Sequence, residues 1–318
     1  MNVVSITQLA EKFTKEDENK LRETFPMHQF SFYNEVEIPE DILKQSDILI
    51  TMRRTAHIMK RMPNLKWTHV VNAGLNDVPF DYLRDHNIVL TSVKGVHKIP
   101  IAEYTIGMML SLVKNSYSLY DLQKKGSWSI STAIDEIHGK TLGILGLGGI
   151  GSEIAKRANA FGMNVLALRR TPSQTPDYVQ EIIPYAQKER IFRNCDFIVV
   201  ILPLTEETIN FIGQEELSMM KDTAYIINIA RGPIIEEKAL INSLRGKKIK
   251  GAVLDVFDQE PLPSDHPLWQ LDNVIITPHM AGHSPNTLKR AMDILIENLK
   301  AYPDQKNMIN VIDLQKEY

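Results

Sequence analysis

Three glycines, at positions 146, 148 and 151, give the sharpest chemical signal in the sequence. They fit the spacing G-x-G-x-x-G in the run Gly146, Leu147, Gly148, Gly149, Ile150 and Gly151. TLGIL, a strand pattern, precedes the run, and SEIAKRA, a helix pattern, follows it. In this setting glycines permit a tight turn, and the free N–H groups of the helix N-terminus face a pyrophosphate. The sequence therefore predicts a dinucleotide-binding turn here.

The cofactor choice depends on the residues after the next predicted strand, NVLAL at 164–168. A site for NAD usually has an acidic residue there, about 20 residues beyond the last glycine, to hold the ribose 2′-hydroxyl. This chain has Arg169, Arg170 and Thr171 instead. Arginine pairs with a 2′-phosphate, and threonine can donate to the same group. The sequence favours NADP over NAD, with a solvated pair of surface arginines as the alternative.

Three more segments follow predicted strands of the same region. They are IINIARGPIIEEKAL, GAVLDVFDQEPLPSDHPLW and NVIITPHMAGHS. Together with the glycine turn, their order resembles the D-isomer-specific 2-hydroxyacid dehydrogenases, a family that contains glyoxylate/hydroxypyruvate reductases and phosphoglycerate dehydrogenase. The resemblance covers nearly the whole chain. It implies an oxidoreductase that transfers a hydride between NAD(P)H and a small 2-oxo or 2-hydroxy acid.

The resemblance also implies three catalytic residues. Arg231 matches the arginine that binds the substrate carboxylate, while Glu260 and His279 match the acid–base pair. The chemistry agrees, because arginine is a planar, permanent cation. Histidine exchanges a proton near neutral pH, and a neighbouring carboxylate favours its protonated form. We expect ketone reduction with His279 protonated and alcohol oxidation with it neutral.

Further positions follow from the resemblance. Asp255 matches the residue that holds the nicotinamide carboxamide. Ala73, Gly74 and Leu75 match a loop whose N–H groups face the substrate carboxylate, although an ordinary strand-to-helix turn is the alternative there. The other positions implied to line the cofactor are Leu202, Pro203, Ile229, Ala230, Ala281 and Gly282.

These residues favour an NADPH-preferring reductase of the glyoxylate/hydroxypyruvate type. An NAD-linked D-lactate or phosphoglycerate dehydrogenase is the alternative within the class. In another class, the family's corepressors use the fold as an NAD(P)-sensing binding module, and a pseudoenzyme that only binds NADP is a third possibility. The acidic residues and histidines show no metal-ligand spacing, and hydride transfer needs no metal.

Short apolar runs alternate with helical patterns and predict the elements that must position these residues. Strands are expected at 46–51, 66–74 and 87–92, and again at 141–146, 164–168, 197–203, 224–230, 251–256 and 273–278. Such alternation indicates an α/β fold with parallel sheets. We expect two Rossmann-like or flavodoxin-like domains with a cleft between them.

The domain bounds follow from where the second strand series begins and ends. A dinucleotide-binding Rossmann domain is expected at 99–285, and a discontinuous substrate domain at 1–98 plus 286–318. A long helical connector is expected at 100–126, a helix at about 286–302, and an extended tail at 309–314. Because the family usually dimerises through its cofactor domain, the connector is a candidate for forming a homodimer.

Composition excludes several classes of protein. The chain has 318 residues with 43% hydrophobic and 24% charged residues, enough for large cores. A net charge of −3 gives no reason to expect nucleic acid or an anionic membrane as a partner. The single cysteine, Cys195, lies in an apolar strand-like run and is expected to be buried. With no signal-peptide pattern and no long apolar run, we expect a cytoplasmic protein.

Overall fold

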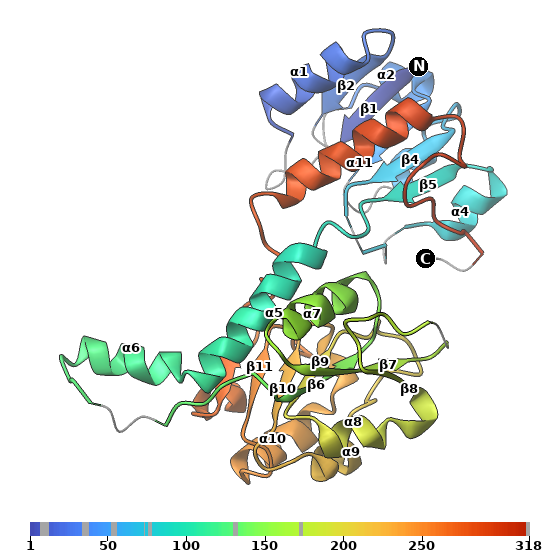
Figure 1. Cartoon of the computed structure of the whole chain (residues 1–318). Helices are drawn as coiled ribbons and strands as arrows, with labels where there is room; N and C mark the ends of the chain where they lie inside the picture. Colours follow the sequence, from blue (N-terminus) through green and yellow to red (C-terminus); the bar gives the residue numbers. More distant parts are fainter. Residues whose placement is uncertain are drawn as a thin grey trace. The chain divides into compact units, whose positions relative to one another are not determined.

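The chain forms two compact units in a computed structural model that describes residues 1–6, 13–33, 38–51, 56–72, 74–75, 78–129, 133–171 and 174–315. Unit 1 comprises Met1–His97 and Ser284–Tyr318, and unit 2 comprises Lys98–His283. These bounds differ from the expected domain bounds by at most two residues. Each unit is built on one parallel sheet (Figure 1).

Unit 1 contains a five-stranded sheet in the order β2-β1-β3-β4-β5, the order of flavodoxin-like folds. The strands are β1 (Asn2–Ile6), β2 (Gln29–Tyr33), β3 (Ile48–Thr51), β4 (Trp67–Val70) and β5 (Val89–Ser92). The helices are α1 (Lys15–Thr24), α2 (Glu40–Gln45), α3 (Ala56–Met59), α4 (Phe80–Asp85) and α11 (Thr287–Ala301).

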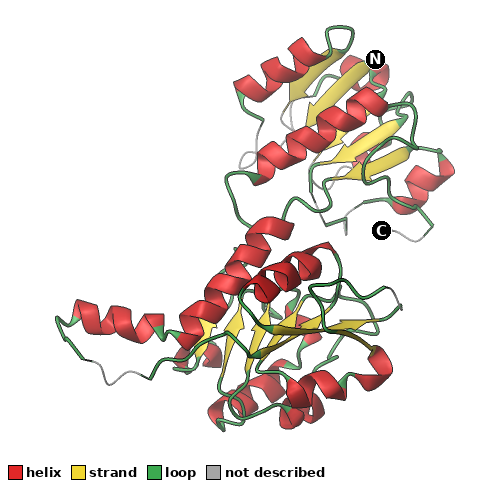
Figure 2. Ribbon diagram, in the orientation of Figure 1, coloured by secondary structure: helices red, strands yellow, loops and turns green. Residues whose placement is uncertain are grey.

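Helices cover both faces of this sheet, which explains why its central strands are buried along their length. Every residue of β3 and β4 is buried. One face packs against α1 and α11, and the other against α2, α3 and α4. Figure 2 shows α11, which comes from the end of the chain, lying across the strands formed by the beginning. The carboxyl-terminal segment thus completes the core of unit 1.

Unit 2 contains a seven-stranded parallel sheet in the order β12-β11-β10-β9-β6-β7-β8. Its first six strands in sequence are arranged as in a doubly wound dinucleotide-binding fold, and β12 extends the edge. The strands are β6 (Thr141–Leu145), β7 (Asn164–Arg169), β8 (Glu181–Pro184), β9 (Phe197–Val200), β10 (Tyr225–Asn228), β11 (Gly251–Leu254) and β12 (Val274–Ile276).

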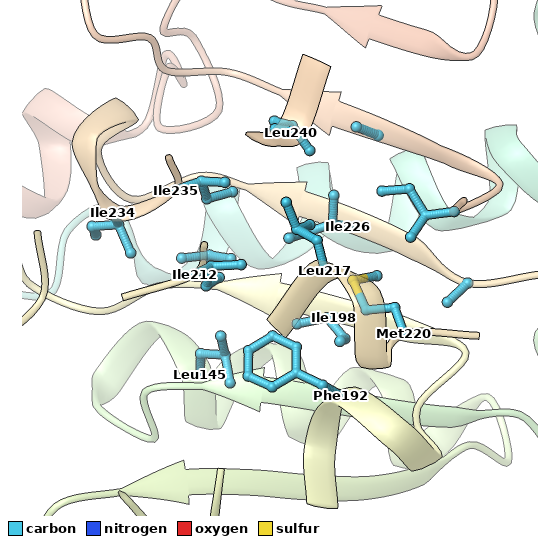
Figure 3. Close-up of a cluster of buried hydrophobic side chains, with 14 of the residues drawn as sticks. Leu145, Phe192, Ile198, Ile212, Leu217, Met220, Ile226, Ile234, Ile235 and Leu240 are labelled. Carbon is cyan, nitrogen blue, oxygen red and sulfur yellow. The ribbon is translucent and has the colours of Figure 1, made fainter. Parts of the chain in front are cut away.

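Two layers of helices enclose the unit 2 sheet. One face packs against α5 (Lys98–Val113) and α7 (Gly149–Ala160). The other face packs against α8 (Glu189–Asn194), α9 (Gln214–Met219) and α10 (Glu237–Arg245). Figure 3 shows the core on this second face, where Phe192 and Leu217 meet Ile198 and Ile226 of the sheet. The remaining elements are α6 (Ser116–Lys124), η1 (Tyr185–Gln187), η2 (Gly232–Ile234) and η3 (Pro267–Gln270).

The structure differs from the sequence prediction in several elements. Each predicted strand overlaps an observed strand, but β1, β2 and β8 were not predicted. The connector at 100–126 is two helices, α5 and α6, because Asn115 adopts a left-handed φ of 50° between them. The tail at 309–314 forms only an isolated antiparallel bridge, Thr91 with Val311. No helix in the described ranges combines the length and apolarity needed to cross a membrane.

The strand directions of unit 2 place the loops that carry the predicted site residues at one edge of the sheet. Because all strands are parallel, the turns after β6, β7, β9, β10, β11 and β12 leave the same, carboxyl edge of the sheet. The order reverses at β6, which lies between β9 and β7. Ligands of open α/β sheets bind outside the carboxyl ends at such a reversal.

Candidate active site

The glycine turn connects β6 to α7 at this reversal point. Gly146 has a φ of 115°, and a Cβ there would lie 2.9 Å from the carbonyl oxygen of Ile201. A Cβ on Gly151 would lie 2.1 Å from the carbonyl oxygen of Gly146. Glycine is therefore required at both positions, at the first by conformation and at both by close backbone approach.

The start of α7 fits an anionic ligand. Gly148 is its N-cap and Gly149 its first residue, and no side chain caps the helix or puts negative charge in its first turn. The first N–H groups of a helix need partners and carry a partial positive charge. The exposed, uncapped glycines at 148 and 149 leave these groups accessible, as a pyrophosphate requires.

The arginine pair lies at the end of β7, the strand next to β6. Arg169 is the last residue of the strand and is partly buried, while Arg170 and Thr171 follow it and are exposed. The Arg170 guanidinium is 2.7 Å from a carboxylate oxygen of Glu207. Both arginines thus lie at the carboxyl end of β7, beside the strand that leads into the glycine turn.

Glu260 and His279 are in direct contact, as the sequence predicts for an acid–base pair. His279 Nδ1 is 2.7 Å from Glu260 Oε2. The backbone N–H of Phe257 donates to Glu260 Oε1 at 3.0 Å, which orients the carboxylate toward the imidazole. The histidine side chain is 51% exposed and the glutamate side chain 36% exposed. The pair is therefore positioned by the protein yet open to a ligand.

The backbone of His279 is held in an unusual conformation. Its φ of 51° lies in the left-handed region, which residues other than glycine seldom adopt. The buried Asp255 fixes the loop around it. Asp255 accepts hydrogen bonds from the N–H of Met280 at Oδ1 and from that of Ala281 at Oδ2, each at 2.9 Å, and its carbonyl accepts from the N–H of His279 at 2.9 Å. These bonds offset the backbone strain at His279.

A hydroxyl chain continues from Asp255 to helix α5. Thr277 donates from Oγ1 to Asp255 Oδ1 at 2.5 Å, and Thr277 Oγ1 is 2.6 Å from the Tyr104 hydroxyl. Because the threonine proton is used toward Asp255, the tyrosine is the donor in the second bond. Burial raises the pKa of Tyr104 to about 12, so it keeps this proton. The Asp255 carboxylate thus accepts three hydrogen bonds, from Thr277, Met280 and Ala281, which leaves about one of its four acceptor sites free.

Arg231 follows β10 and is exposed, and its guanidinium Nη1 donates to the carbonyl oxygen of Ala230 at 2.6 Å. The loop that carries it is fixed by the buried Asn228. The Asn228 amide accepts from the N–H of Ala230 and donates to the carbonyl of Arg231, each at 3.1 Å. The Asn228 side chain thus fixes the backbone of both Ala230 and Arg231.

Gly232 brings the arginine loop against the glutamate loop. A Cβ on Gly232 would lie 2.1 Å from the carbonyl carbon of Phe257 and 2.4 Å from the nitrogen of Asp258. No side chain fits between the two segments. Since Phe257 also donates to Glu260, the Arg231, Glu260 and His279 loops form one connected unit at the ends of β10, β11 and β12.

The other predicted positions in unit 2 differ in how they could contact a ligand. The side chains of Leu147, Leu202, Ile229, Ala230 and Ala281 are buried in the core clusters on the two faces of the sheet. Any contact with a cofactor would therefore come mainly from their backbones. Pro203 is exposed and Gly282 partly buried.

The predicted substrate loop belongs to unit 1. Ala73 lies outside the described residues. Gly74 is exposed, and Leu75 is partly buried and packs against the core on the α2–α4 face. The loop leaves the carboxyl end of β4.

Four residues that position this site were not among the predicted site residues: Asn228, Gly232, Thr277 and Tyr104. Asn228 carried a signal, as an amide at the end of an otherwise apolar strand pattern. Gly232 was part of the quoted motif, but its contact with Phe257 was not foreseeable. Tyr104 and Thr277 are 173 positions apart and had no local signal. In the described part of the chain, no group of three or more potential ligands is arranged to hold a metal ion.

Comparison with known proteins gives a family match within unit 2. The model of the D-isomer specific 2-hydroxyacid dehydrogenase NAD-binding domain matches residues 106–281. This segment contains the glycine turn and all three of Arg231, Glu260 and His279.

Individual relatives extend the similarity to the whole chain. A glyoxylate/hydroxypyruvate reductase B from an Enterobacter species is 33% identical, covering 92% of this chain and 94% of that protein. A D-3-phosphoglycerate dehydrogenase from Methanocaldococcus jannaschii is 34% identical over 86% of this chain, which spans about half (52%) of its length. A D-isomer specific 2-hydroxyacid dehydrogenase from Xanthobacter autotrophicus Py2, solved with NADPH and MES, has a TM-score of 0.81 at 25% identity, covering 99% of each chain.

Proposed function

Because the chain belongs to the D-isomer-specific 2-hydroxyacid dehydrogenase family, we propose that it reduces a small 2-oxo acid with NADPH in preference to NADH. Glyoxylate and hydroxypyruvate are the proposed substrate type. The observation that carries the proposal is the 2.7 Å contact of His279 Nδ1 with Glu260, on loops that share the carboxyl edge with the glycine turn.

The proposed roles follow from this contact. Glu260 binds Nδ1, so Nε2 is the nitrogen that gives a proton to the substrate carbonyl oxygen. The Glu260 carboxylate stabilises the protonated imidazole before transfer and fixes the orientation of the ring. Arg231 binds the carboxylate of the 2-oxo acid. In the reverse direction, neutral His279 accepts the hydroxyl proton.

The cofactor is proposed to bind along the carboxyl edge of the unit 2 sheet. The N–H groups at 148 and 149 would hold its pyrophosphate, and Arg169 with Arg170 a 2′-phosphate. When bound, the reduced nicotinamide supplies the hydride. The free acceptor site of Asp255 is the proposed partner of the carboxamide, and the Gly74–Leu75 turn that of the substrate carboxylate.

The test is loss of the reduced-nicotinamide absorbance with glyoxylate or hydroxypyruvate, comparing NADPH with NADH. We expect faster loss with NADPH, and a shift toward NADH in Arg169→Asp. Faster loss with NADH would retain the reaction and refute the cofactor preference, as an NAD-linked D-lactate or phosphoglycerate enzyme predicts. Binding of either nucleotide without turnover of any 2-oxo acid would favour a cofactor-sensing role.

We further propose that the protein forms a homodimer through unit 2. Helix α6 buries none of its residues, and it projects from the body of unit 2 (Figure 1). The segment from α6 onward exposes Tyr117, Tyr120, Trp128 and Ile134, with Trp128 99% exposed. An isolated short helix is marginal in water, and a large apolar patch indicates an interface. A groove beside it is lined by Leu112, Ile134, Trp269 and Val274.

Light scattering during size-exclusion chromatography tests the dimer. We expect twice the chain mass for the wild type and monomers for Trp128→Ser. The control is Met27→Ser, which removes an exposed apolar side chain from unit 1 and should remain dimeric. A monomeric wild type would refute this proposal without affecting the proposed reaction.

A further inference from the structure

The ion pair between Arg170 and Glu207 joins two loops across the reversal point of the unit 2 sheet. Arg170 follows β7, and Glu207 lies in the segment after β9; these strands flank β6. The guanidinium also lies over the Tyr185 ring, 5.9 Å from its centroid. The pair is therefore placed where the adenosine end of the proposed cofactor would lie, beyond the glycine turn.

The turn that carries Glu207 is held by a buried hydroxyl. Thr208 is fully buried, and its Oγ1 donates to the carbonyl of Pro203 at 2.7 Å and accepts from the N–H of Thr205 at 2.7 Å. These bonds close the turn on both sides of Glu207. The backbone beneath the carboxylate is thus fixed before any cofactor arrives.

A carboxylate and a phosphate compete for the same guanidinium. The Arg170 and Glu207 side chains are 58% and 67% exposed, so their pair is a surface ion pair of small intrinsic strength. A 2′-phosphate monoester carries nearly two negative charges at neutral pH. When it binds Arg170, it must displace Glu207 or lie a few ångströms from its charge, and either event weakens binding.

We propose that Glu207 is a specificity-determining residue that opposes binding of the 2′-phosphate and so limits the preference for NADPH over NADH. The inference rests on the proposed function, because it requires that Arg170 meet the 2′-phosphate. NADH has a hydroxyl at that position and is not subject to the same repulsion. Removing the Glu207 charge should therefore strengthen the binding of ligands that carry the 2′-phosphate and leave that of ligands without it nearly unchanged.

Calorimetric titration of the Glu207→Gln variant tests this without turnover. The probes are 2′,5′-ADP, which carries the phosphate, and 5′-ADP, which lacks it. In 50 mM salt we expect Glu207→Gln to bind 2′,5′-ADP about 3- to 10-fold more tightly than the wild type, and 5′-ADP within about twofold. The gain should shrink in 0.5 M salt, because exposed charges are then screened.

Glu206→Gln is the matched control, since it removes the same charge from the neighbouring exposed position. It should bind both probes within about twofold of the wild type. A Glu207→Gln variant that binds 2′,5′-ADP like Glu206→Gln, or more weakly than the wild type, would overturn the inference.

The outcomes also separate the inference from the proposed function. A wild type that prefers 2′,5′-ADP, with no gain in Glu207→Gln, overturns the inference alone. A wild type without preference, but with a preference that emerges in Glu207→Gln, supports the inference and corrects the proposed NADPH preference. No preference in either protein removes the 2′-phosphate role of the arginines and overturns both.

Discussion

The proposed chemistry depends on one contact between side chains 19 positions apart, Glu260 and His279. Neither residue is buried, so the geometry cannot come from packing of the side chains themselves. It comes from backbone bonds: the N–H of Phe257 orients the glutamate, and Asp255 holds the left-handed turn at His279. The residues that react and the residues that hold them are therefore different.

Substitution of His279 tests the acid–base role. We expect His279→Ala to lower kcat by about 100-fold or more, the contribution typical of a positioned acid or base. Glu260→Gln should lower kcat less, since the imidazole keeps its backbone support but loses the charge that stabilises its protonated form. His283→Ala, at an exposed histidine in the same segment, is the control and should retain activity. Near-normal turnover by His279→Ala would remove this residue from the mechanism.

At the scale of elements, the site depends on three loops that leave neighbouring strands and touch one another. Gly232 makes this possible, because the backbone after β10 lies against the backbone after β11 with no room for a side chain. Asn228 then fixes the loop after β10 internally, and Asp255, at the end of β11, holds the loop after β12 that carries His279. A small displacement at either contact would move Arg231 relative to the Glu260–His279 pair.

Alanine substitution at Gly232 tests this coupling. The new Cβ, 2.1 Å from Phe257, must push the two loops apart. We expect kcat to fall by about 10- to 100-fold, because ångström-scale misplacement of reacting groups has effects of that size, with a stability loss of about 1–3 kcal/mol. Gly107→Ala is the control: it lies within α5 with open space around it and should stabilise the protein by about 0.5–1 kcal/mol. Equal kcat values for both variants would contradict the coupling.

At the scale of the molecule, stability comes from two sheets that are each covered on both faces, and few polar side chains lie in these cores. His69 on β4 is one of them and is fully buried. Its Nδ1 is 2.8 Å from Thr91 Oγ1, which also accepts from Trp67 Nε1 at 2.9 Å. Its Nε2 has no hydrogen-bond partner. Burial lowers the pKa of His69 to about 3 from 6.5.

This histidine should make unfolding depend on pH. Between about pH 6.5 and pH 3 the unfolded chain binds a proton at this position that the folded chain does not, so stability falls as the pH falls through this window. From pH 7 to pH 5 we expect a loss of about 2 kcal/mol in unfolding free energy from His69 alone. His69→Leu should lack this component of the loss.

Urea unfolding followed by tryptophan fluorescence measures the effect. The measurement is made in the Trp128→Ser background, because Trp128 lies in the proposed dimer interface. Of the two remaining tryptophans, Trp67 is buried in unit 1 and Trp269 is 51% exposed, so the change in signal reports mainly on unit 1. Equal pH dependence in the wild type and His69→Leu would show that His69 is not buried in its neutral form.

The sequence by itself determined the α/β class, the glycine turn, the arginine pair and the family to which Arg231, Glu260 and His279 belong. These features are local, since each is carried by a short motif that follows a strand pattern. Amphipathic or apolar runs also located most strands. The short edge strand β8 and the start of unit 1 carried too little pattern, and the helix break at Asn115 depends on a single left-handed residue.

Only the tertiary structure decided which side chains hold the motifs in place. Tyr104 meets Thr277, Gly232 meets Phe257, and Arg170 meets Glu207, each from a different segment of the chain. These contacts follow from the strand order, in which β9 rather than β8 lies beside β6, and β10, β11 and β12 lie side by side. Parallel strands bring their carboxyl ends to one edge whatever their distance in sequence. Contacts at that edge therefore depend on topology, which no local pattern contains.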